Sequence, residues 1–169
     1  TSLYAEEVPQ EVYKLIADIE TWAKDTTLID TIKQQNMKAV SLDEIKKQDE
    51  VWMETSAVND FMQLLMNNKA AQKLKGFEAT KSYYLELFLM DNQGANVAMT
   101  DKTSDYWQGD EAKFQKTFAG QGAVHVGKVK FDDSSQAYLV QVSVPVIDGG
   151  VPIGALTVGV NLDELDKGL

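Results

Sequence analysis

The chain has 169 residues, of which 44% are hydrophobic, a formal net charge of -10 and no cysteine. This length and composition fit a folded domain with a core of its own, and no apolar run is long enough to span a bilayer. The negative charge opposes binding to nucleic acids and anionic membrane surfaces, and the lack of cysteine excludes disulfides and thiolate chemistry.

The first third of the chain predicts one long helix over about residues 8–36. Apolar residues recur there at three- and four-residue steps, at Val8, Val12, Leu15, Ile19, Trp22, Ile29 and Ile32. At 1.5 Å per residue such a helix is about 40 Å long. The pattern leaves open whether part of this stripe meets a second chain, as in a homodimer, or whether all of it packs on its own domain.

Shorter helices are predicted next. The sequence "SLDE" at 41–44 has the spacing of a capping box, in which the Ser41 hydroxyl accepts from the Glu44 N–H. Two further helical segments are expected around 57–67 and 69–79, with Asn67–Asn68 as the break between them.

The pattern changes to strands after residue 82. A hairpin is expected from "YYLELFLMD" and "ANVAMT" around the turn "DNQG", and then a short helix in "DEAKFQKTFAG". Three strands follow in "AVHVGKVKFD", "AYLVQVSVPVI" and "VPIGALTVGVN", the last two joined by an Asp148–Gly149–Gly150 turn. The sequence therefore predicts one α+β domain, with a helical part at 1–80 and a five-stranded antiparallel sheet with short covering helices at 81–165.

Two stretches of this sheet region resemble a known family. They are "LFLMDNQGANVAMTDKTSDYWQGDEAKFQKTF" and "VGKVKFDDSSQAYLVQVSVPVIDGGVPIGALTVGVNLDEL". Both are similar to the Cache family of sensor domains, also called PDC or extracellular PAS-like domains, and the single-Cache type is the nearest match. The resemblance covers about residues 84–165, and over residues 1–80 it depends only on the long helix that this family places before its PAS-like sheet.

The resemblance implies an extracytoplasmic sensor domain, such as the ectodomain of a bacterial chemoreceptor or histidine kinase. It also implies a small-molecule pocket between the sheet and the segment that joins its second and third strands. Many Cache domains that bind amino acids use an Arg and a Trp near the start of the short helix. This chain has Glu111, Lys113 and Phe114 there and no arginine at all, which argues against amino-acid binding by that route.

The loop "DYWQGDE" carries the first candidate ligand contacts, Asp105, Tyr106, Trp107 and Gln108. From the residues alone, the two rings cap an open end of the hydrophobic sheet and contribute only core area. The family resemblance favours the other interpretation, in which the loop lies over the pocket and its rings form apolar walls, together with Phe114. Lys102 and Asp105 would then orient the ligand.

The strand 123–132 offers further candidates. His125 is a core residue or a ligand contact, and the alternation does not decide whether His125 or Lys128 faces the pocket. Lys113 and Lys130 are expected on solvated faces. Asp132 is either a turn residue or an acceptor for a ligand amine, and Gln141 lies on a solvated face or points into the pocket.

Catalysis is not expected. One histidine and no cysteine leave little for a nucleophile triad, and no metal-ligand spacing or phosphate-binding loop is present. No cofactor is expected. The sequence therefore predicts a domain that binds a small polar metabolite, with a small carboxylate favoured over an amine, and that signals through a homodimer of its N-terminal helix.

Two other functions stay open, a freestanding periplasmic solute-binding protein and a dimerisation module without a ligand. The location is expected to be extracytoplasmic, with any membrane contact through flanking segments outside this chain.

Overall fold

The computed structural model describes residues 7–119, 122–133 and 135–167. Six helices come first: α1 (Gln10–Tyr13), α2 (Ile16–Trp22), α3 (Thr26–Met37), α4 (Leu42–Glu54), α5 (Asp60–Asn67) and α6 (Lys69–Glu78). The strands follow as β1 (Tyr84–Met90), β2 (Asn96–Met99), β3 (His125–Val126), β4 (Lys130–Asp132), β5 (Ala137–Asp148) and β6 (Val151–Asn161). Helix α7 (Ala112–Phe114) and the π-helix η1 (Gln115–Ala119) lie between β2 and β3, and α8 (Leu162–Lys167) follows β6.

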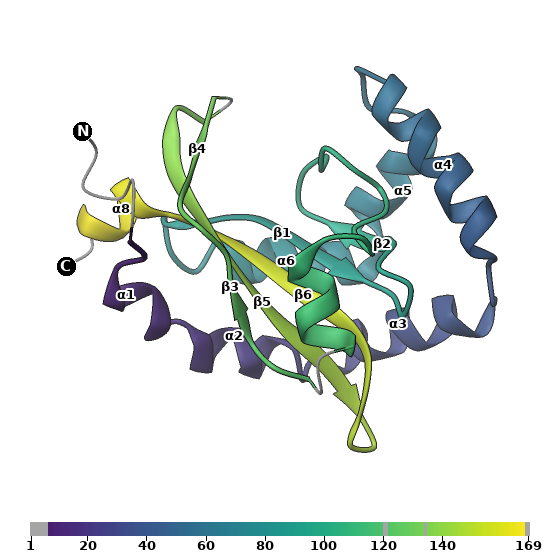
Figure 1. The fold of residues 1–169 in the computed structure, drawn as a ribbon, viewed down its shortest axis with the longest axis horizontal. Coiled ribbons are helices and arrows are strands. Elements are labelled where there is room, and N and C mark those ends of the chain that lie inside the picture. Colours follow the sequence, from purple (N-terminus) through teal and green to yellow (C-terminus); the bar gives the residue numbers. More distant parts are fainter. Residues whose placement is uncertain (1–6, 120–121, 134, 168–169) are drawn as a thin grey trace.

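The strands form one antiparallel sheet, in the order β2-β1-β6-β5-β3, with β4 also paired to β5 (Figure 1). The long β5–β6 hairpin is its centre, and it turns at Gly149 and Gly150, whose φ values of 60° and 80° suit glycine. The first strand pairs with the last, since Tyr84 lies opposite Val160. The predicted α+β class with an antiparallel sheet is confirmed.

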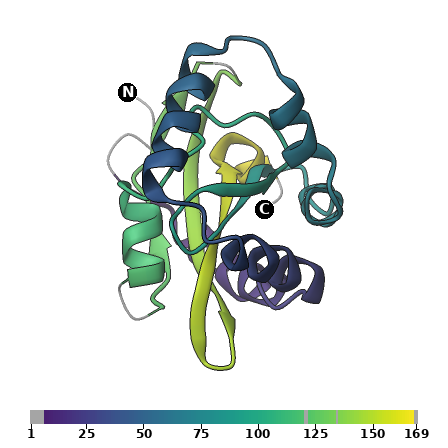
Figure 2. The same cartoon turned by 90° about the vertical axis from the view of Figure 1, so that its right-hand side faces the viewer.

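The segment predicted as one long helix is three helices, α1, α2 and α3. Asp25 has extended backbone angles, and its carboxylate accepts from the N–H groups of Thr27 and Leu28. An Asp with this geometry is an N-cap, so a new helix begins there and the earlier one cannot continue through it. The three helices still follow one another along a single face of the sheet (Figures 1 and 2).

The strand predicted at 123–132 is two strands, so the sheet has six strands where five are expected. Val126 and Val129 both pack against the same core, although alternation would place them on opposite faces. The chain leaves the ladder between β3 and β4, where only the Gly127 N–H still donates to the Gln141 carbonyl, at 2.9 Å.

Several local predictions are confirmed. Ser41 caps α4 by accepting from the Glu44 N–H, and Asn68 ends α5 and caps α6. The short helix expected in "DEAKFQKTFAG" is α7 followed by η1, and its Phe114 and Phe118 rings stack with centroids 5.0 Å apart.

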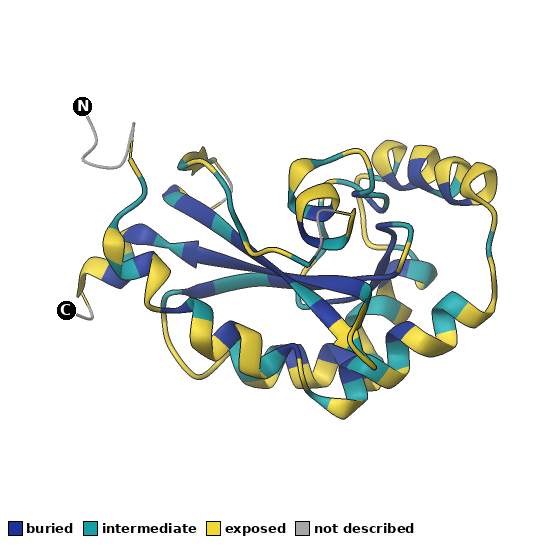
Figure 3. Cartoon of the chain, turned by 60° about the horizontal axis from the view of Figure 1, so that its bottom comes forward, coloured by how far each residue is buried: buried dark blue, intermediate teal, exposed yellow. Residues whose placement is uncertain are grey.

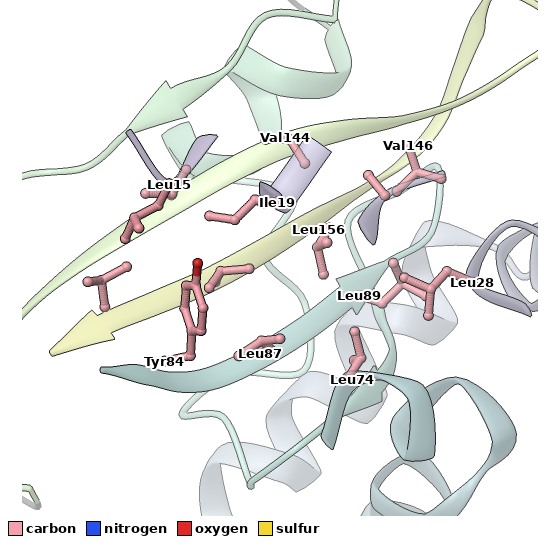
Figure 4. Close-up of a cluster of buried hydrophobic side chains, with 14 of the residues drawn as sticks. Leu15, Ile19, Leu28, Leu74, Tyr84, Leu87, Leu89, Val144, Val146 and Leu156 are labelled. Carbon is pink, nitrogen blue, oxygen red and sulfur yellow. The ribbon is translucent and has the colours of Figure 1, made fainter. Parts of the chain in front are cut away.

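The two faces of the sheet are covered differently. The larger hydrophobic cluster lies under α1–α3, α6 and α8, whose buried sides face the sheet (Figure 3), and it holds the fully buried stripe residues Val12, Ile19 and Ile32. Figure 4 shows Ile19 in this cluster together with Leu15 and Val144. The stripe therefore packs on its own sheet. The smaller cluster lies on the opposite face, against α4, α5 and the 101–118 segment, and contains Trp52 and Phe88. We call these the helix-covered face and the loop-covered face.

Candidate functional site

A bulge in β1 turns a charged residue towards the loop-covered face. Leu85 pairs with Gly159 of β6 and Phe88 with Thr157, so two residues of β1 lie opposite one residue of β6. Glu86 is one of those two and has a φ of 57°. A bulge of this kind shifts the alternation of side chains along a strand. Tyr84 therefore packs in the larger hydrophobic cluster on the helix-covered face, whereas Glu86 and Phe88 line one cavity on the other face.

This cavity has a volume of about 300 Å³ and lies between the sheet and the loop that follows β2. The strands contribute Glu86 and Phe88 from β1, Asp132 from β4 and Gln141 from β5. The loop and α7 complete the lining with Lys102, Thr103, Ser104, Gln108 and Lys113. Four of the residues predicted from the sequence thus lie together here, namely Lys102, Gln108, Asp132 and Gln141.

Helix α4 holds the loop in place. The buried carboxylate of Asp49 accepts from the backbone N–H groups of Tyr106 and Trp107, each at 3.0 Å. The Trp52 indole N–H donates to the Thr103 carbonyl at 2.8 Å. From β2, the Asn96 amide donates to the Thr103 hydroxyl at 2.7 Å. The cavity-lining part of the loop therefore depends on side chains more than 50 residues earlier in the chain.

Tyr106 and Trp107 do not line this cavity. Tyr106 is 6% exposed and packs against Trp52 and Phe61, with ring centroids 5.5 and 5.3 Å away. Burial, and then the charges of Asp91 and Asp49, raise the pKa of Tyr106 to about 12. The Trp107 indole N–H donates to the Gln93 carbonyl at 2.8 Å, and the Lys46 ammonium lies 5.2 Å from the centre of its ring. The geometry thus matches the core interpretation of this pair.

Four other predicted residues also lie outside the lining. The backbone carbonyl of Asp105 accepts from Gln108, and burial, followed by the nearby Glu111, raises the pKa of the Asp105 carboxyl. Phe114 is buried in the smaller hydrophobic cluster, and Lys128 is exposed. His125 pairs with Ser143 and so shares the face of Gln141. Its pKa is lowered by burial and then by Lys116 and Lys113.

The cavity contains charges of both signs. The pKa of Glu86 is raised, first by burial and then by the carboxylates of Asp132, Asp101 and Glu78, while Lys113 opposes the shift. Lys113 forms an ion pair with Glu111 at 2.9 Å and lies over the Phe88 ring, and only 20% of its side chain is exposed. The expectation that Lys113 lies on a solvated face is therefore wrong. Lys102 has no ion-pair partner among the described residues.

Sequence reasoning missed five residues of the lining: Glu86, Phe88, Thr103, Ser104 and Lys113. One signal was present, because Glu86 is the one charged residue in the apolar run "YYLELFLM". A charged residue within a buried strand is uncommon unless it has a partner or faces a cavity.

A second hollow, of about 460 Å³, lies between the end of α3, the β1–β2 turn and η1. Neutral side chains such as Gln35, Asn36 and Gln93 form most of its lining. Its single carboxylate, Asp91, accepts from the backbone N–H groups of Gln93 and Ala95 within its own turn. Since the lining of the smaller cavity holds four charged side chains of both signs, we assign the candidate site to it.

Among the described residues, no group of Asp, Glu and His side chains is arranged to hold a metal ion. No helix in the described ranges is both long enough and apolar enough to cross a membrane.

No protein-family model and no curated protein matches this sequence. Solved structures do match. The sensor domain of the Vibrio cholerae histidine kinase DctB has a TM-score of 0.42 at 15% identity, over 94% of this chain and 55% of that chain. The ligand-binding domain of the Pseudomonas aeruginosa PAO1 amino-acid chemoreceptor PctC, solved with GABA, has a TM-score of 0.48 at 14% identity, over 95% of this chain and 66% of that chain. The sensory domain of the Campylobacter jejuni chemoreceptor Tlp3 has a TM-score of 0.48 at 14% identity, over 93% of this chain and 66% of that chain.

The structures similar to this chain are sensor domains. The chain spans 55% to 66% of the length of the three. The likeness is one of overall fold alone.

Proposed function

We propose that this chain is an extracytoplasmic ligand-binding sensor domain of a bacterial signalling protein, and that it binds a small polar metabolite without transforming it. The single observation that supports this most is the cavity between the sheet and the loop, with two lysines, two carboxylates and two carboxamides in its lining. Lys113, Gln108 and Asp132 already have partners within the fold. A ligand that pairs with Lys102, Glu86 or Gln141 would recover the cost of desolvating those side chains.

The size of the cavity limits the ligand. A volume of about 300 Å³ is at the lower end of the range for small-molecule sites. The Phe88 ring is the one large apolar surface in the lining. A ligand of a few carbon atoms with charged ends suits this space better than a flat aromatic or a lipid.

The charges indicate the ligand class, a small carboxylate that also carries an amine. Lys102 and Lys113 can hold a carboxylate as point charges, since no arginine is available for a bidentate pair. Glu86 lies in the same lining and can accept from an ammonium group. Asp132 can contribute as a second acceptor, although its Oδ2 atom also accepts from the Ser135 N–H at 2.9 Å and so serves its own turn. An ammonium there would also relieve the repulsion that raises the pKa of Glu86.

Occupancy would be transmitted through the helices that cover the other face of the sheet, and in a homodimer the exposed side of α1–α3 would be the contact. Such transmission requires that the ligand bind one arrangement of the domain more tightly than another. A freestanding solute-binding protein would use the same cavity but would show no change in self-association on binding.

Thermal unfolding against three probes tests the proposal: succinate, 4-aminobutyrate and putrescine. A ligand at 100 times its dissociation constant stabilises the fold by about 2.7 kcal/mol, which is a rise of several degrees in Tm at this size. We expect the largest rise with 4-aminobutyrate and its loss in Lys102→Ala, whereas Lys128→Ala, an exposed lysine outside the lining, should respond like the wild type. Flat responses to all three probes would contradict the proposal and would favour a dimerisation module without a ligand.

A further inference from the structure

Glu78 has an unusual position for an acidic residue. It is the last residue of α6, where the helix dipole disfavours a negative charge. Its Oε1 atom accepts from the backbone N–H of Glu86 at 2.9 Å and from the Thr100 hydroxyl at 3.1 Å. These two bonds, rather than helix stability, explain a carboxylate at this position.

The bond to Glu86 satisfies a donor that the bulge removes from the ladder. In a regular strand, the N–H groups of β1 would pair alternately with β6 and β2, but the extra residue of the bulge is left unpaired. A polar backbone group without a partner inside a protein is costly. Glu78 supplies that partner from another element.

Thr100 extends the arrangement to the neighbouring residue. Its hydroxyl accepts from the Leu87 N–H at 3.0 Å, and its own N–H donates to the Leu87 carbonyl at 2.9 Å. The two bulge residues are thus held by the end of α6 and by the residue after β2. This support keeps Glu86 at its positive φ of 57°, a conformation that a non-glycine residue adopts only when its surroundings impose it.

We propose that Glu78, which does not line the cavity, is the positioning residue that holds the Glu86 carboxylate at the cavity and links the cavity to α6. The part of this inference that concerns ligand binding rests on the proposed function. Helix α6 packs through Leu74 and Phe77 into the hydrophobic cluster of the helix-covered face. A change at Glu86 on one face of the sheet therefore reaches the helices on the other face through a single carboxylate.

Two substitutions separate the roles of Glu78. Glu78→Gln keeps an oxygen that can accept from the Glu86 N–H but removes the charge, and Glu78→Ala removes both. Glu54 is the matched control, because it is the last residue of α4 and is exposed, and its side chain has no hydrogen bond or ion pair with any residue that the structure describes. Glu54→Ala should therefore leave Glu86 unchanged.

Nuclear magnetic resonance of the domain gives the test that needs no ligand. In Glu78→Ala we expect the Glu86 N–H to exchange about tenfold faster or more, with a three-bond HN–Hα coupling that no longer reports a positive φ. In Glu78→Gln the exchange and the coupling should stay close to wild type, while the Glu86 carboxyl titrates at a lower pH because one of its three neighbouring carboxylates is gone. An unchanged Glu86 in both variants would overturn the proposal.

Binding of 4-aminobutyrate gives the second test. If Glu78 positions Glu86, Glu78→Ala should weaken the binding of 4-aminobutyrate about tenfold. The affinity of Glu78→Gln should stay within about twofold of the wild type near neutral pH. A residue that only stabilises the fold would lower Tm in Glu78→Ala and leave the affinity of the folded domain unchanged, which would overturn the positioning role. If the wild type binds none of the probes, the proposed function fails, and the resonance measurements still decide whether Glu78 holds Glu86.

Discussion

The two faces of the sheet differ in how they are filled. On the helix-covered face, alternate residues of β5 and β6, such as Val142, Val144, Leu156 and Val158, are fully buried in one continuous apolar cluster. On the loop-covered face, Gln141 lies in the cavity lining, and the Ser143 and Thr157 hydroxyls bond to each other at 2.7 Å. One face of the sheet therefore provides stability, and the other provides positions for polar groups.

The largest effect is expected from the helix-covered face. Leu156→Ala removes a fully buried side chain from the larger cluster and should lower the free energy of unfolding by about 2–5 kcal/mol. Because Leu156 lies on the opposite face from the cavity, the affinity of the folded domain for 4-aminobutyrate should not change. Denaturant unfolding and calorimetry on the same sample check both points, and a large loss of affinity would show that the two faces are not independent.

A smaller loss of stability, accompanied by a loss of affinity, is expected when Asp49, which holds the loop after β2, is replaced. Asp49→Ala leaves the N–H groups of Tyr106 and Trp107 without their shared acceptor, at a cost of about 1–3 kcal/mol. Since the same loop carries Thr103 and Ser104 of the lining, the affinity for 4-aminobutyrate should also fall. Glu50→Ala, at the exposed neighbouring position of α4, is the control for both measurements. Loss of stability with unchanged affinity would mean that the lining does not depend on this anchor.

The smallest expected effect is an increase in stability, whereas the two substitutions above lower it. The pKa of Glu86 is raised above its ordinary value of 4.5, chiefly by burial, so its ionised form makes folding less favourable. This cost is absent below the ordinary pKa, appears as the pH rises through the window between the ordinary and the raised pKa, and is fully present above it. Glu86→Gln should therefore raise Tm at pH 7, and its advantage should vanish as the pH falls to 4. A lower Tm than wild type at pH 7 would contradict this account.

The same comparison explains what the sequence could predict. Apolar alternation in 137–147 and 151–161 defines the helix-covered face, because burial of one face imposes a period of two. The turns at 91–94 and 148–150 are equally local signals. The α+β class, the β5–β6 hairpin and the helix caps at Ser41 and Asn68 follow from such signals.

The candidate site depends on partners distant in sequence, and these have no local signal. The bulge at Glu86 requires Glu78 and Thr100, and the inward turn of the Tyr106–Trp107 loop requires Asp49. Polar residues that terminate or interrupt an element also act against a strong apolar pattern, as Asp25 does when it ends the predicted long helix. The period of apolar residues along a strand or helix predicts which side chains are buried. It does not predict where the hydrogen bonding between strands is interrupted.

The pairing of the first strand with the last has a kinetic consequence. The β5–β6 hairpin joins residues close in sequence and can form early, whereas β1 can be paired on both sides only after β6 has been synthesised. Until then, the edge of β1 that will meet β6 exposes apolar side chains and unpaired backbone groups, which is a condition that favours aggregation. Docking of β1 onto the finished hairpin is therefore expected to limit the folding rate, and the bulge at Glu86 forms in that same step.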